Sequence, residues 1–427
     1  IENLDGGFTV CGTIETPLAT TLLDMVLLKV DGFGDTLWQR QIALRGNQRP
    51  YGLFQLPDST YLVAGHHDNF DSLGSQVMLA RFDAAGDTLW TRTWGDTAQE
   101  IARDLVLTPN GTCALAGYRD DGNVRQALLL EADLNGDTLQ WRTFSGPAGD
   151  AEFRGLVAEG HGWTATGWTA SAAGDQELWL VQVDTALNLR WMQVHAEPWN
   201  RFGNAVRRAP NGDYWVAGVE MDLGLVAVDA LLFHADSTGG FRAEYTFGGP
   251  GTDRATDLQF ASNGELVFSG YRSLINLSSD LLVMRVDTLG NVIWSGIYGG
   301  ISFDYANSLR PVSDGGFIVA GNTGSFTPGD GQLYVVRLDS LGNVVGILDE
   351  NTETVLAYPN PVQNGVKWLG VAAGEVEVMD LDGRRVLQAT WRAGDPAVSV
   401  EGLRSGLYLW RMRTEEGRVY SGKLRVE

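Results

Sequence analysis

A unit of about 51 residues recurs seven times along this chain. The segment Val30–Trp38 (Val-Asp-Gly-Phe-Gly-Asp-Thr-Leu-Trp) reappears as Phe82–Trp90 (Phe-Asp-Ala-Ala-Gly-Asp-Thr-Leu-Trp). The aspartates that mark the unit are 50 to 52 residues apart: Asp31, Asp83, Asp133, Asp184, Asp236, Asp287 and Asp339. A glycine that closes a short apolar run keeps the same period: Gly12, Gly65, Gly117, Gly167, Gly218, Gly270 and Gly321. A period of this length indicates a repeat architecture, in which each copy covers its neighbours.

Each copy is predicted to contain four short β-strands. In the second copy these are Tyr51–Leu56, Tyr61–Gly65, Val77–Phe82 and Leu89–Trp94. The strands are rich in Val, Leu, Trp and Tyr, and turn residues such as Gly-Asp and Asn-Gly separate them. No stretch of useful length has the period of a helix. The sequence therefore predicts an all-β protein.

Four strands in about 50 residues are typical of a β-propeller blade, and seven blades close into a ring without exposed edges. We expect a seven-bladed β-propeller over residues 1–349. The first copy starts at Leu4-Asp5-Gly6-Gly7, which aligns with Ser313–Gly316, so its own first strand is missing. Either residues ahead of Ile1 or the stretch Thr352–Tyr358 would complete it. We expect the former, because Thr352–Tyr358 comes slightly early in the period.

The composition limits the possible partners. Lys and Arg number 31 against 53 Asp and Glu, a formal net charge of −22, which opposes binding to nucleic acid or an anionic bilayer. No apolar run approaches 18 residues, so no membrane-spanning helix is expected. Cys11 and Cys113 fall in copies that do not touch, and we expect two free thiols.

Two recurring residues have predicted structural roles. A Trp follows the repeat Asp by seven residues at Trp38, Trp90, Trp191 and Trp294, and by eight at Trp141. A large ring at a fixed place in a repeat is expected to pack between blades. The repeat aspartates are expected to accept backbone N–H groups in their own turns rather than to bind cations.

The repeat resembles known propeller repeats. Its Asp-x-x-Gly-[Asp/Asn]-x-x-Trp pattern loosely resembles that of quinoproteins. It is more similar to secreted propeller repeats, through Asp314–Gly321 (Asp-Gly-Gly-Phe-Ile-Val-Ala-Gly), Val335–Asn343 (Val-Val-Arg-Leu-Asp-Ser-Leu-Gly-Asn) and Tyr298-Gly299-Gly300. This resemblance implies a fold and no activity.

The end of the chain breaks the period and differs in charge. Residues 357–427 hold ten Lys and Arg and nine Asp and Glu, a net of +1, which leaves −23 for the rest. A polar linker is predicted at 350–356. Alternating apolar residues and the turn signal Asp382-Gly383 predict a small immunoglobulin-like β-sandwich over 357–427.

Four ordered motifs in this segment resemble the type A C-terminal sorting domain of the type IX secretion system. They are Tyr358-Pro359-Asn360-Pro361-Val362, Val378–Arg384, Leu403–Tyr408 and Gly422–Val426, with Asp382, Gly383, Gly406, Tyr408 and Lys423 as further motif positions. The resemblance implies that the translocon recognises residues 357–427. It also implies that the chain is secreted or held on the outer-membrane surface of a Gram-negative bacterium.

Signs of catalysis are few. His66-His67-Asp68 with Asp71 offers metal ligands, but neighbouring strand residues point in opposite directions, and we predict no metal, cofactor or catalytic residue. No common catalytic motif occurs.

A binding face is expected at the channel or at the loops after the second strands: His66–Ser75, Tyr118–Val124, Trp168–Gly174 and Tyr271–Ser279. The leading hypothesis is a non-enzymatic module that binds protein or glycan. The alternative is an extracellular hydrolase or lyase, which acidic and Arg side chains meeting at one channel mouth would favour.

Overall fold

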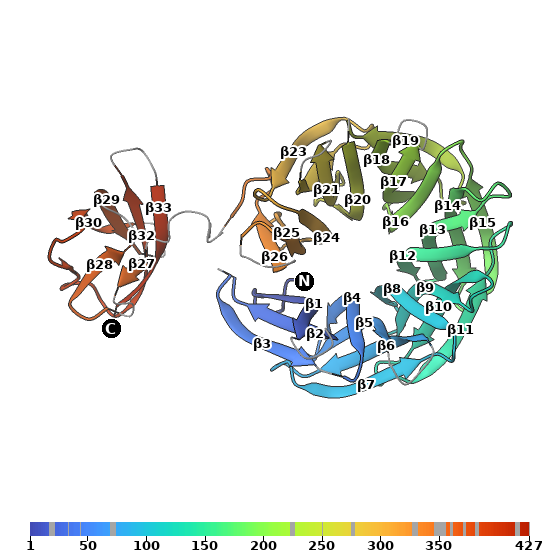
Figure 1. The fold of residues 1–427 in the computed structure, drawn as a ribbon, viewed down its shortest axis with the longest axis horizontal. Coiled ribbons are helices and arrows are strands. Elements are labelled where there is room, and N and C mark those ends of the chain that lie inside the picture. The colour runs from blue at the N-terminus through green and yellow to red at the C-terminus, as the bar shows by residue number, and fades with distance from the viewer. Residues whose placement is uncertain are drawn as a thin grey trace. The chain divides into compact units, whose positions relative to one another are not determined.

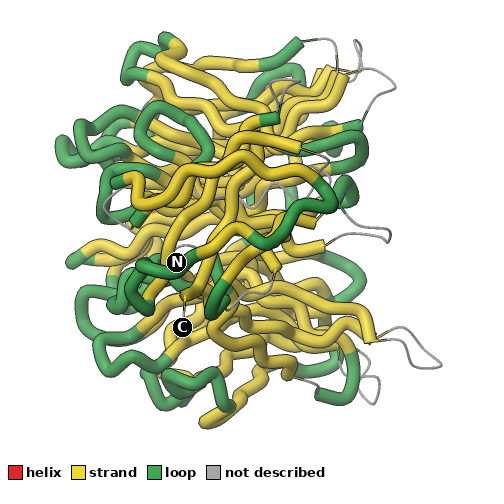
Figure 2. The backbone as a smooth tube through the Cα atoms, turned by 90° about the vertical axis from the view of Figure 1, so that its left-hand side faces the viewer, coloured by secondary structure: helices red, strands yellow, loops and turns green. Residues whose placement is uncertain are grey.

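The computed structural model describes residues 1–16, 22–32, 34–42, 44–68, 74–222, 227–249, 251–274, 278–326, 332–345, 356–358, 362–369, 373–380, 384–414 and 419–426. The chain divides into two compact units, Ile1–Gly346 and Ile347–Glu427. The regular elements described are all β-strands (Figure 2). No helix among the described residues has the length and apolar character needed to cross a membrane.

The first unit is a ring of seven blades, numbered 1 to 7 in chain order, of which blades 5 and 6 are joined in one eight-stranded sheet (Figure 1). Blade 1 contains β1 (Phe8–Thr16), β2 (Leu22–Val30) and β3 (Thr36–Ile42). Blade 2 contains β4 (Asn47–Gln55), β5 (Tyr61–Asp68), β6 (Ser75–Phe82) and β7 (Thr88–Trp94). Blade 3 contains β8 (Gln99–Leu107), β9 (Cys113–Asp120), β10 (Arg125–Ala132) and β11 (Thr138–Phe144). Blade 4 contains β12 (Ala151–Glu159), β13 (Gly162–Ala170), β14 (Gln176–Asp184) and β15 (Leu189–His195).

The remaining blades follow the same order. Blade 5 contains β16 (Asn200–Arg208), β17 (Tyr214–Asp222), β18 (Ala227–Ala235) and β19 (Phe241–Phe247). Blade 6 contains β20 (Gly251–Phe260), β21 (Leu266–Leu274), β22 (Ser279–Val286) and β23 (Val292–Tyr298). Blade 7 contains β24 (Asp304–Pro311), β25 (Phe317–Thr323) and β26 (Gln332–Leu338). Blades 5 and 6 also touch at their edges through a parallel pairing of Val228 with Thr252.

The predicted seven-bladed propeller is confirmed. Each blade is an antiparallel meander, and in Figure 1 the first strand of blades 2 to 7 lies nearest the centre of the ring. The predicted strands of the second copy match β4 to β7, but β5 runs on to Asp68. His66 and His67 are therefore strand residues and do not belong to the predicted loop.

Blades 1 and 7 close the ring. Arg337 donates a hydrogen bond to the Gly32 carbonyl at 2.9 Å, and its guanidinium lies 5.6 Å from the centroid of the Phe8 ring. Apolar side chains of both blades form one cluster: Phe8, Val30, Val312 and Ile318. In blade 1, Glu2 pairs with Phe8 at the position of a first strand. The alternative was that Thr352–Tyr358 would complete blade 1. It is wrong for Leu356–Tyr358, because these residues pair with β28 (Gly365–Leu369). Residues 352–355 lie outside the described residues.

The recurring glycine faces a β-bulge. In blades 2 to 7 the first strand carries one extra residue opposite this glycine, such as Arg103 between Ala102 and Asp104 opposite Gly117. A Cβ on Gly117 would lie 1.8 Å from the Ile101 carbonyl oxygen. The glycine is therefore required because the bulge brings the neighbouring backbone too close for any side chain.

The repeat aspartates form a hydrogen-bonded turn. Asp236, for example, accepts the backbone N–H groups of Thr238 at 2.8 Å and Gly240 at 3.0 Å. Equivalent bonds reach each of Asp31, Asp83, Asp133, Asp184, Asp287 and Asp339. These bonds hold the pKa of Asp133, Asp184, Asp236, Asp287 and Asp339 below its usual value.

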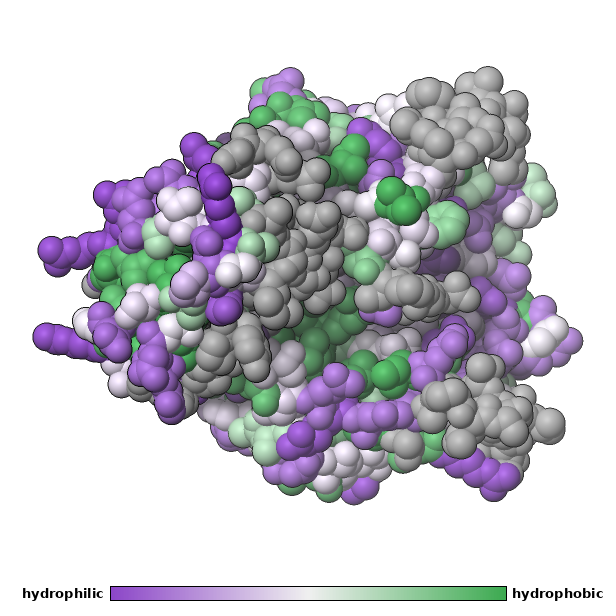
Figure 3. Space-filling view, turned by 60° about the vertical axis from the view of Figure 1, so that its left-hand side comes forward, coloured by the Kyte–Doolittle hydropathy of each residue, from purple (hydrophilic) through white to green (hydrophobic). Residues whose placement is uncertain are grey.

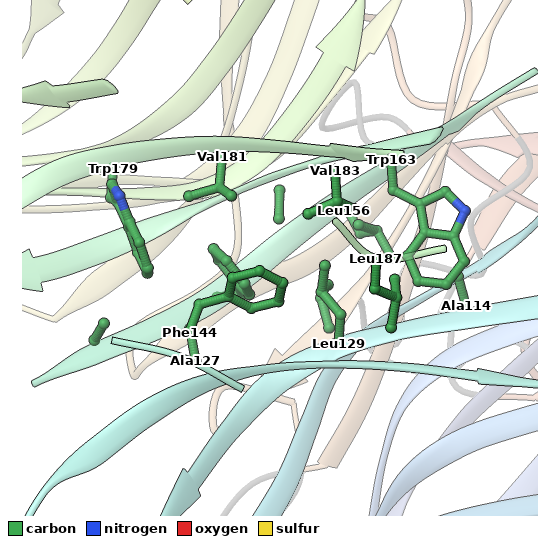
Figure 4. Close-up of a cluster of buried hydrophobic side chains, with 14 residues drawn as sticks. Ala114, Ala127, Leu129, Phe144, Leu156, Trp163, Trp179, Val181, Val183 and Leu187 are labelled. Atoms are coloured by element: carbon green, nitrogen blue, oxygen red, sulfur yellow. The ribbon is translucent and has the colours of Figure 1, made fainter. Parts of the chain in front are cut away.

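Apolar side chains fill the space between blades. Between blades 3 and 4, Trp179 stacks on Phe153 at 5.0 Å between ring centroids, and Phe144 also contacts Phe153, at 5.8 Å. Figure 4 shows Trp179 and Phe144 in this cluster. Trp163 and Leu156 are buried in the same cluster. The outer surface is different: in Figure 3 hydrophilic residues alternate with small hydrophobic areas, as expected for a surface that faces water.

The second unit contains two sheets. One pairs β27 (Leu356–Tyr358), β28 and β31 (Val398–Ser399). The other pairs β30 (Arg385–Arg392), β29 (Ala373–Met379), β32 (Gly406–Arg413) and β33 (Val419–Val426). Side chains of both sheets share one buried cluster, which includes Trp368, Trp391, Trp410 and Met412.

Candidate ligand site at the channel mouth

Arginine and aromatic side chains alternate on the first, second and third strands of blades 2 to 6. Most of them lie in the first half or middle of a first strand, or in the second half of a second strand, and we call this end of the ring the channel mouth. We name as the arginine–aromatic belt the residues Tyr51, Arg103, Tyr118, Arg125, Arg154, Trp168, Phe202 and Arg254. They come from β4, β8, β9, β10, β12, β13, β16 and β20, so that blades 2 to 6 all contribute.

The rings of the belt hold its guanidinium groups. Arg103 lies 5.3 Å from the centroid of Tyr51 and 5.5 Å from that of Tyr118. Arg125 lies 4.2 Å from the Tyr118 centroid and 6.0 Å from that of Trp168. On the other side, Arg154 and Arg254 lie 4.4 and 6.0 Å from the Phe202 centroid. Each contact is a cation–π interaction that fixes an arginine in place.

Glu152 joins three of these arginines. Its carboxylate accepts hydrogen bonds from Arg103 at 3.2 Å, Arg125 at 3.0 Å and Arg154 at 3.2 Å. The Glu152 side chain is only 1 % exposed, and a buried carboxylate requires such charged partners. Arg125 also pairs with Asp120 at 3.2 Å. Among the described residues, Glu152 and Asp120 are the carboxylates that form ion pairs with Arg103, Arg125 and Arg154.

The belt therefore carries excess positive charge. Burial, followed by the nearby charges of Arg103 and Arg254, lowers the pKa of Arg154 even though Glu152 opposes the shift. Tyr118, Trp168 and Phe202 are buried, whereas the side chains of Arg103, Arg125 and Arg154 keep 27 to 30 % of their surface exposed. The rings thus support guanidinium groups that face the solvent.

Two further carboxylates line the channel, but they join blades. Asp104 accepts the N–H of Leu156 in the next blade at 2.8 Å. Asp257 likewise accepts the N–H of Leu309 at 2.9 Å and pairs with Arg207 at 2.9 Å and Arg310 at 2.6 Å. Burial raises the pKa of Asp104. Both side chains hold neighbouring first strands together.

Tyr51 and His66 lie at one end of the belt. The Tyr51 hydroxyl accepts a hydrogen bond from Arg103 at 3.1 Å, and its ring stacks on His66 at 5.6 Å. Burial lowers the pKa of His66 to about 4, so the imidazole is neutral at pH 7. His67 points elsewhere and contacts the Arg45 carbonyl at 2.7 Å. No cluster of three His, Cys, Asp or Glu fit for a metal is present within the described ranges, and Asp71 lies outside them.

The sorting-motif residues lie in the second unit. Tyr358 ends β27, Gly406 and Tyr408 lie on β32, and Lys423 lies on β33. The Tyr408 hydroxyl donates to the Arg404 carbonyl at 2.8 Å. Pro359, Asn360, Pro361, Asp382 and Gly383 fall outside the described residues.

The channel was one of the two places where a binding face was expected, but the residues of the belt were not predicted as a site. Three residues that follow a repeat glycine, His66, Tyr118 and Trp168, start loops that were expected to carry a binding face, and all three lie in strands beside or within the belt. The available signal was the residue type at two repeat positions. These are the position after the glycine, with Tyr118 and Trp168, and the bulge, with Arg103 and Arg154.

The sorting-domain resemblance is confirmed by a family comparison. Residues 356–427 match the family Por_Secre_tail, described as a secretion system C-terminal sorting domain. The chain is therefore exported through the type IX secretion system to the cell surface or the extracellular space. No curated protein matches the chain significantly.

Solved structures show only distant likeness. PorZ, a surface component of the type IX secretion system of Porphyromonas gingivalis, is 13% identical with a TM-score of 0.45, over 94% of this chain and 63% of that one. The chain thus spans less than two thirds of PorZ. An alpha-L-arabinanase from Penicillium chrysogenum is 14% identical with a TM-score of 0.46, over 69% and 94%. The propeller domain of the Trilobed protease from Pyrococcus furiosus is 9% identical with a TM-score of 0.46, over 80% and 92%.

Proposed function

We propose that the exported propeller is a non-catalytic module that binds a protein or glycan ligand at the arginine–aromatic belt. The observation that carries this proposal is the set of four arginines fixed by aromatic rings around one channel mouth. Arg254 adds to it: its Nε is buried and has no hydrogen-bond partner among the described residues. A ligand acceptor at this position would satisfy that group.

The chemistry of the belt favours an anionic group on the ligand. A guanidinium offers paired N–H donors that match the two oxygens of a carboxylate, sulfate or phosphate. The chain as a whole is strongly acidic, with a formal net charge of −22, so a local cluster of arginines stands out against its surroundings. Holding the arginines in place before binding reduces the entropy lost when the ligand docks.

An extracellular hydrolase or lyase is the alternative. Acidic and Arg side chains do meet at this mouth, which on sequence grounds favours a catalyst. Glu152, however, is buried and accepts bonds from three arginines, while Asp104 and Asp257 accept backbone N–H groups of the next blade. These carboxylates support the ring, so binding is the function we place first.

The test is a binding and turnover assay on the full chain. An immobilised panel of acidic and neutral polysaccharides and of acidic and neutral proteins is offered to the native chain and to Arg254→Gln. Arg242→Gln is the control, because Arg242 is an exposed arginine on β19, away from the belt. We expect binding to an acidic panel member to fall about tenfold in Arg254→Gln, equivalent to roughly 1.4 kcal/mol, and to stay unchanged in the control.

The contrary outcomes are equally definite. Binding that is absent for the native chain, or equal in Arg254→Gln and in the native chain, contradicts a ligand site at the belt. Each panel member is also assayed for cleavage products. If the native chain cleaves a panel member and Arg254→Gln does not, the protein is an enzyme and the proposal of a non-catalytic module is wrong.

A further inference from the structure

A cavity of about 510 Å³ lies between blades 2 and 3 and shares no residue with the arginine–aromatic belt. We call it the interblade cleft. Its apolar wall includes Val77, Leu128 and Leu130, and two indoles line it, Trp94 of β7 and Trp141 of β11. The volume lies within the range of roughly 300 to 1,000 Å³ that is usual for small-molecule sites.

Trp141 is available to a ligand because the repeat is shifted by one residue here. The equivalent indole of blade 2, Trp90, lies against Gly136 in the following blade. In blade 3 this position is taken by Gln140, which donates to the Thr185 carbonyl at 2.7 Å. Successive strand residues face opposite sides, so Trp141 is turned away from that turn, and it is 57% exposed. The indole therefore takes no part in the packing that its counterpart provides.

The polar wall of the cleft contains an unsatisfied carboxylate oxygen. Arg119 pairs with Oε1 of Glu100 at 3.1 Å and with Asp96 at 2.8 Å. Glu100 is 7% exposed, and its Oε2 is buried without a hydrogen-bond partner among the described residues. Such an orphaned acceptor destabilises the fold, and a hydrogen-bond donor on a ligand would remove this cost. Burial, followed by the charge of Asp96, raises the pKa of Glu100.

We propose that the interblade cleft binds a neutral pyranose unit of a glycan. The C–H face of a sugar matches an indole, and its hydroxyl groups donate to Glu100 Oε2 and accept from Arg119. Glu100, Asp96 and Arg119 sum to a charge of −1, so an acidic sugar is disfavoured here. This site is independent of the belt, whose arginines favour an anionic group.

The experiment is a titration of the full chain with the methyl β-glycosides of glucose, galactose, mannose and N-acetylglucosamine. Binding is followed by indole fluorescence and by saturation transfer from protein to sugar in NMR. We expect at least one glycoside to bind, and its affinity to fall tenfold or more in Trp141→Ala. Glu100→Gln should lower the affinity for the same glycoside. The thermal midpoint of this variant shows whether the propeller is still folded.

Two controls separate this site from other effects. Phe241→Ala removes an aromatic residue that is 56% exposed on the outer strand of blade 5, and it should leave sugar affinity unchanged. Arg254→Gln should also leave it unchanged, which distinguishes the cleft from the belt. The proposal is overturned if none of the four glycosides binds, or if Trp141→Ala binds them as tightly as the native chain. It is also overturned if the cleft binds the apolar cation n-butylammonium and not the glycosides.

Discussion

The indole of Trp90 in blade 2 lies against Gly136 in the outer turn of blade 3. A Cβ on Gly136 would come within 2.8 Å of the indole Cζ3, and Gly136 has a φ of +86°. The same relationship joins blades around the ring: Trp38 with Gly86, Trp191 with Gly239, Tyr245 with Gly290 and Trp294 with Gly342. The recurring aromatic ring and the turn glycine are therefore one interblade contact, made by residues 45 to 48 positions apart.

Replacing Gly136 with alanine should destabilise the propeller by more than the cost of backbone strain alone. Gly136→Ala combines a left-handed φ, which costs a side chain about 1–2 kcal/mol, with a clash against Trp90 that adds about 1–3 kcal/mol. Gly111→Ala is the matched control in the same blade, because its φ is +78° but nothing lies within 4 Å. Urea midpoints of the full chain measure both. Equal shifts in the two variants would show that the indole contributes nothing.

Blade 4 contains an exception to this contact. Its turn has Leu187 where the others have glycine, with a φ of 59° and 2% exposure. The preceding blade has Gln140 at the position that Trp38, Trp90, Trp191 and Trp294 occupy in their own blades. Gln140 donates to the Thr185 carbonyl in that same turn. The smaller Gln140 leaves room for the leucine, so the two departures compensate each other.

This compensation predicts a non-additive pair of substitutions. Gln140→Trp alone should clash with Leu187, and Leu187→Gly alone should leave a cavity that costs about 2–5 kcal/mol. The double variant restores the contact of the other blades and should be more stable than the sum of the single effects by at least about 0.5 kcal/mol. A double-mutant cycle from urea unfolding gives the coupling. Additive effects would mean that the two positions do not interact.

Much of the ring was predictable from sequence, but the belt was not. The aspartates, turn glycines and second-strand glycines recur because each solves a backbone problem that every blade shares, so periodicity finds them. Arg103, Arg154 and Arg254 belong to the belt because of their contacts with rings of other blades, about 50 residues away in sequence. A repeat pattern places them in a strand but does not show that they surround one mouth. Trp141 illustrates the same limit: its shift is visible in the spacing, yet it was expected to pack between blades.

The second-strand glycine gives a sharper test of the bulges. In Gly117→Ala the new Cβ would meet the Ile101 carbonyl oxygen at 1.8 Å, so the bulge that carries Arg103 must move. We expect a loss of about 3 kcal/mol or more and weaker binding at the belt. Gly12→Ala is the control from blade 1, where the closest neighbours of a Cβ are 3.9 Å away. A small effect in both variants would contradict the role of the glycine in accommodating the bulge.

The turn aspartates predict sensitivity to acid. Hydrogen bonds from Thr238, first its hydroxyl and then its N–H, lower the pKa of Asp236 in the folded state. The unfolded carboxyl binds its proton near pH 4, so the stabilisation is complete above that pH and is lost as pH falls through the lower folded pKa. The urea midpoint should therefore decrease below about pH 4. The difference in urea midpoint between the native chain and Asp236→Ala should become smaller over the same pH range. A difference that stays constant from pH 7 to pH 2.5 would contradict the prediction.

The two cysteines should be unreactive in the folded chain. Both are free; Cys113 is fully buried, and its thiol donates to the Ala132 carbonyl at 3.4 Å. Burial raises the pKa of Cys113 to about 12 and that of Cys11 to about 11, so almost no thiolate forms near neutral pH. Because the thiolate is the reactive species, an exported chain can keep both thiols outside the reducing cytosol. Ellman's reagent at pH 8 should label neither cysteine in the native chain and both in urea. Rapid labelling of Cys113 without urea would mean that the cluster between blades 2 and 3 opens in the native state.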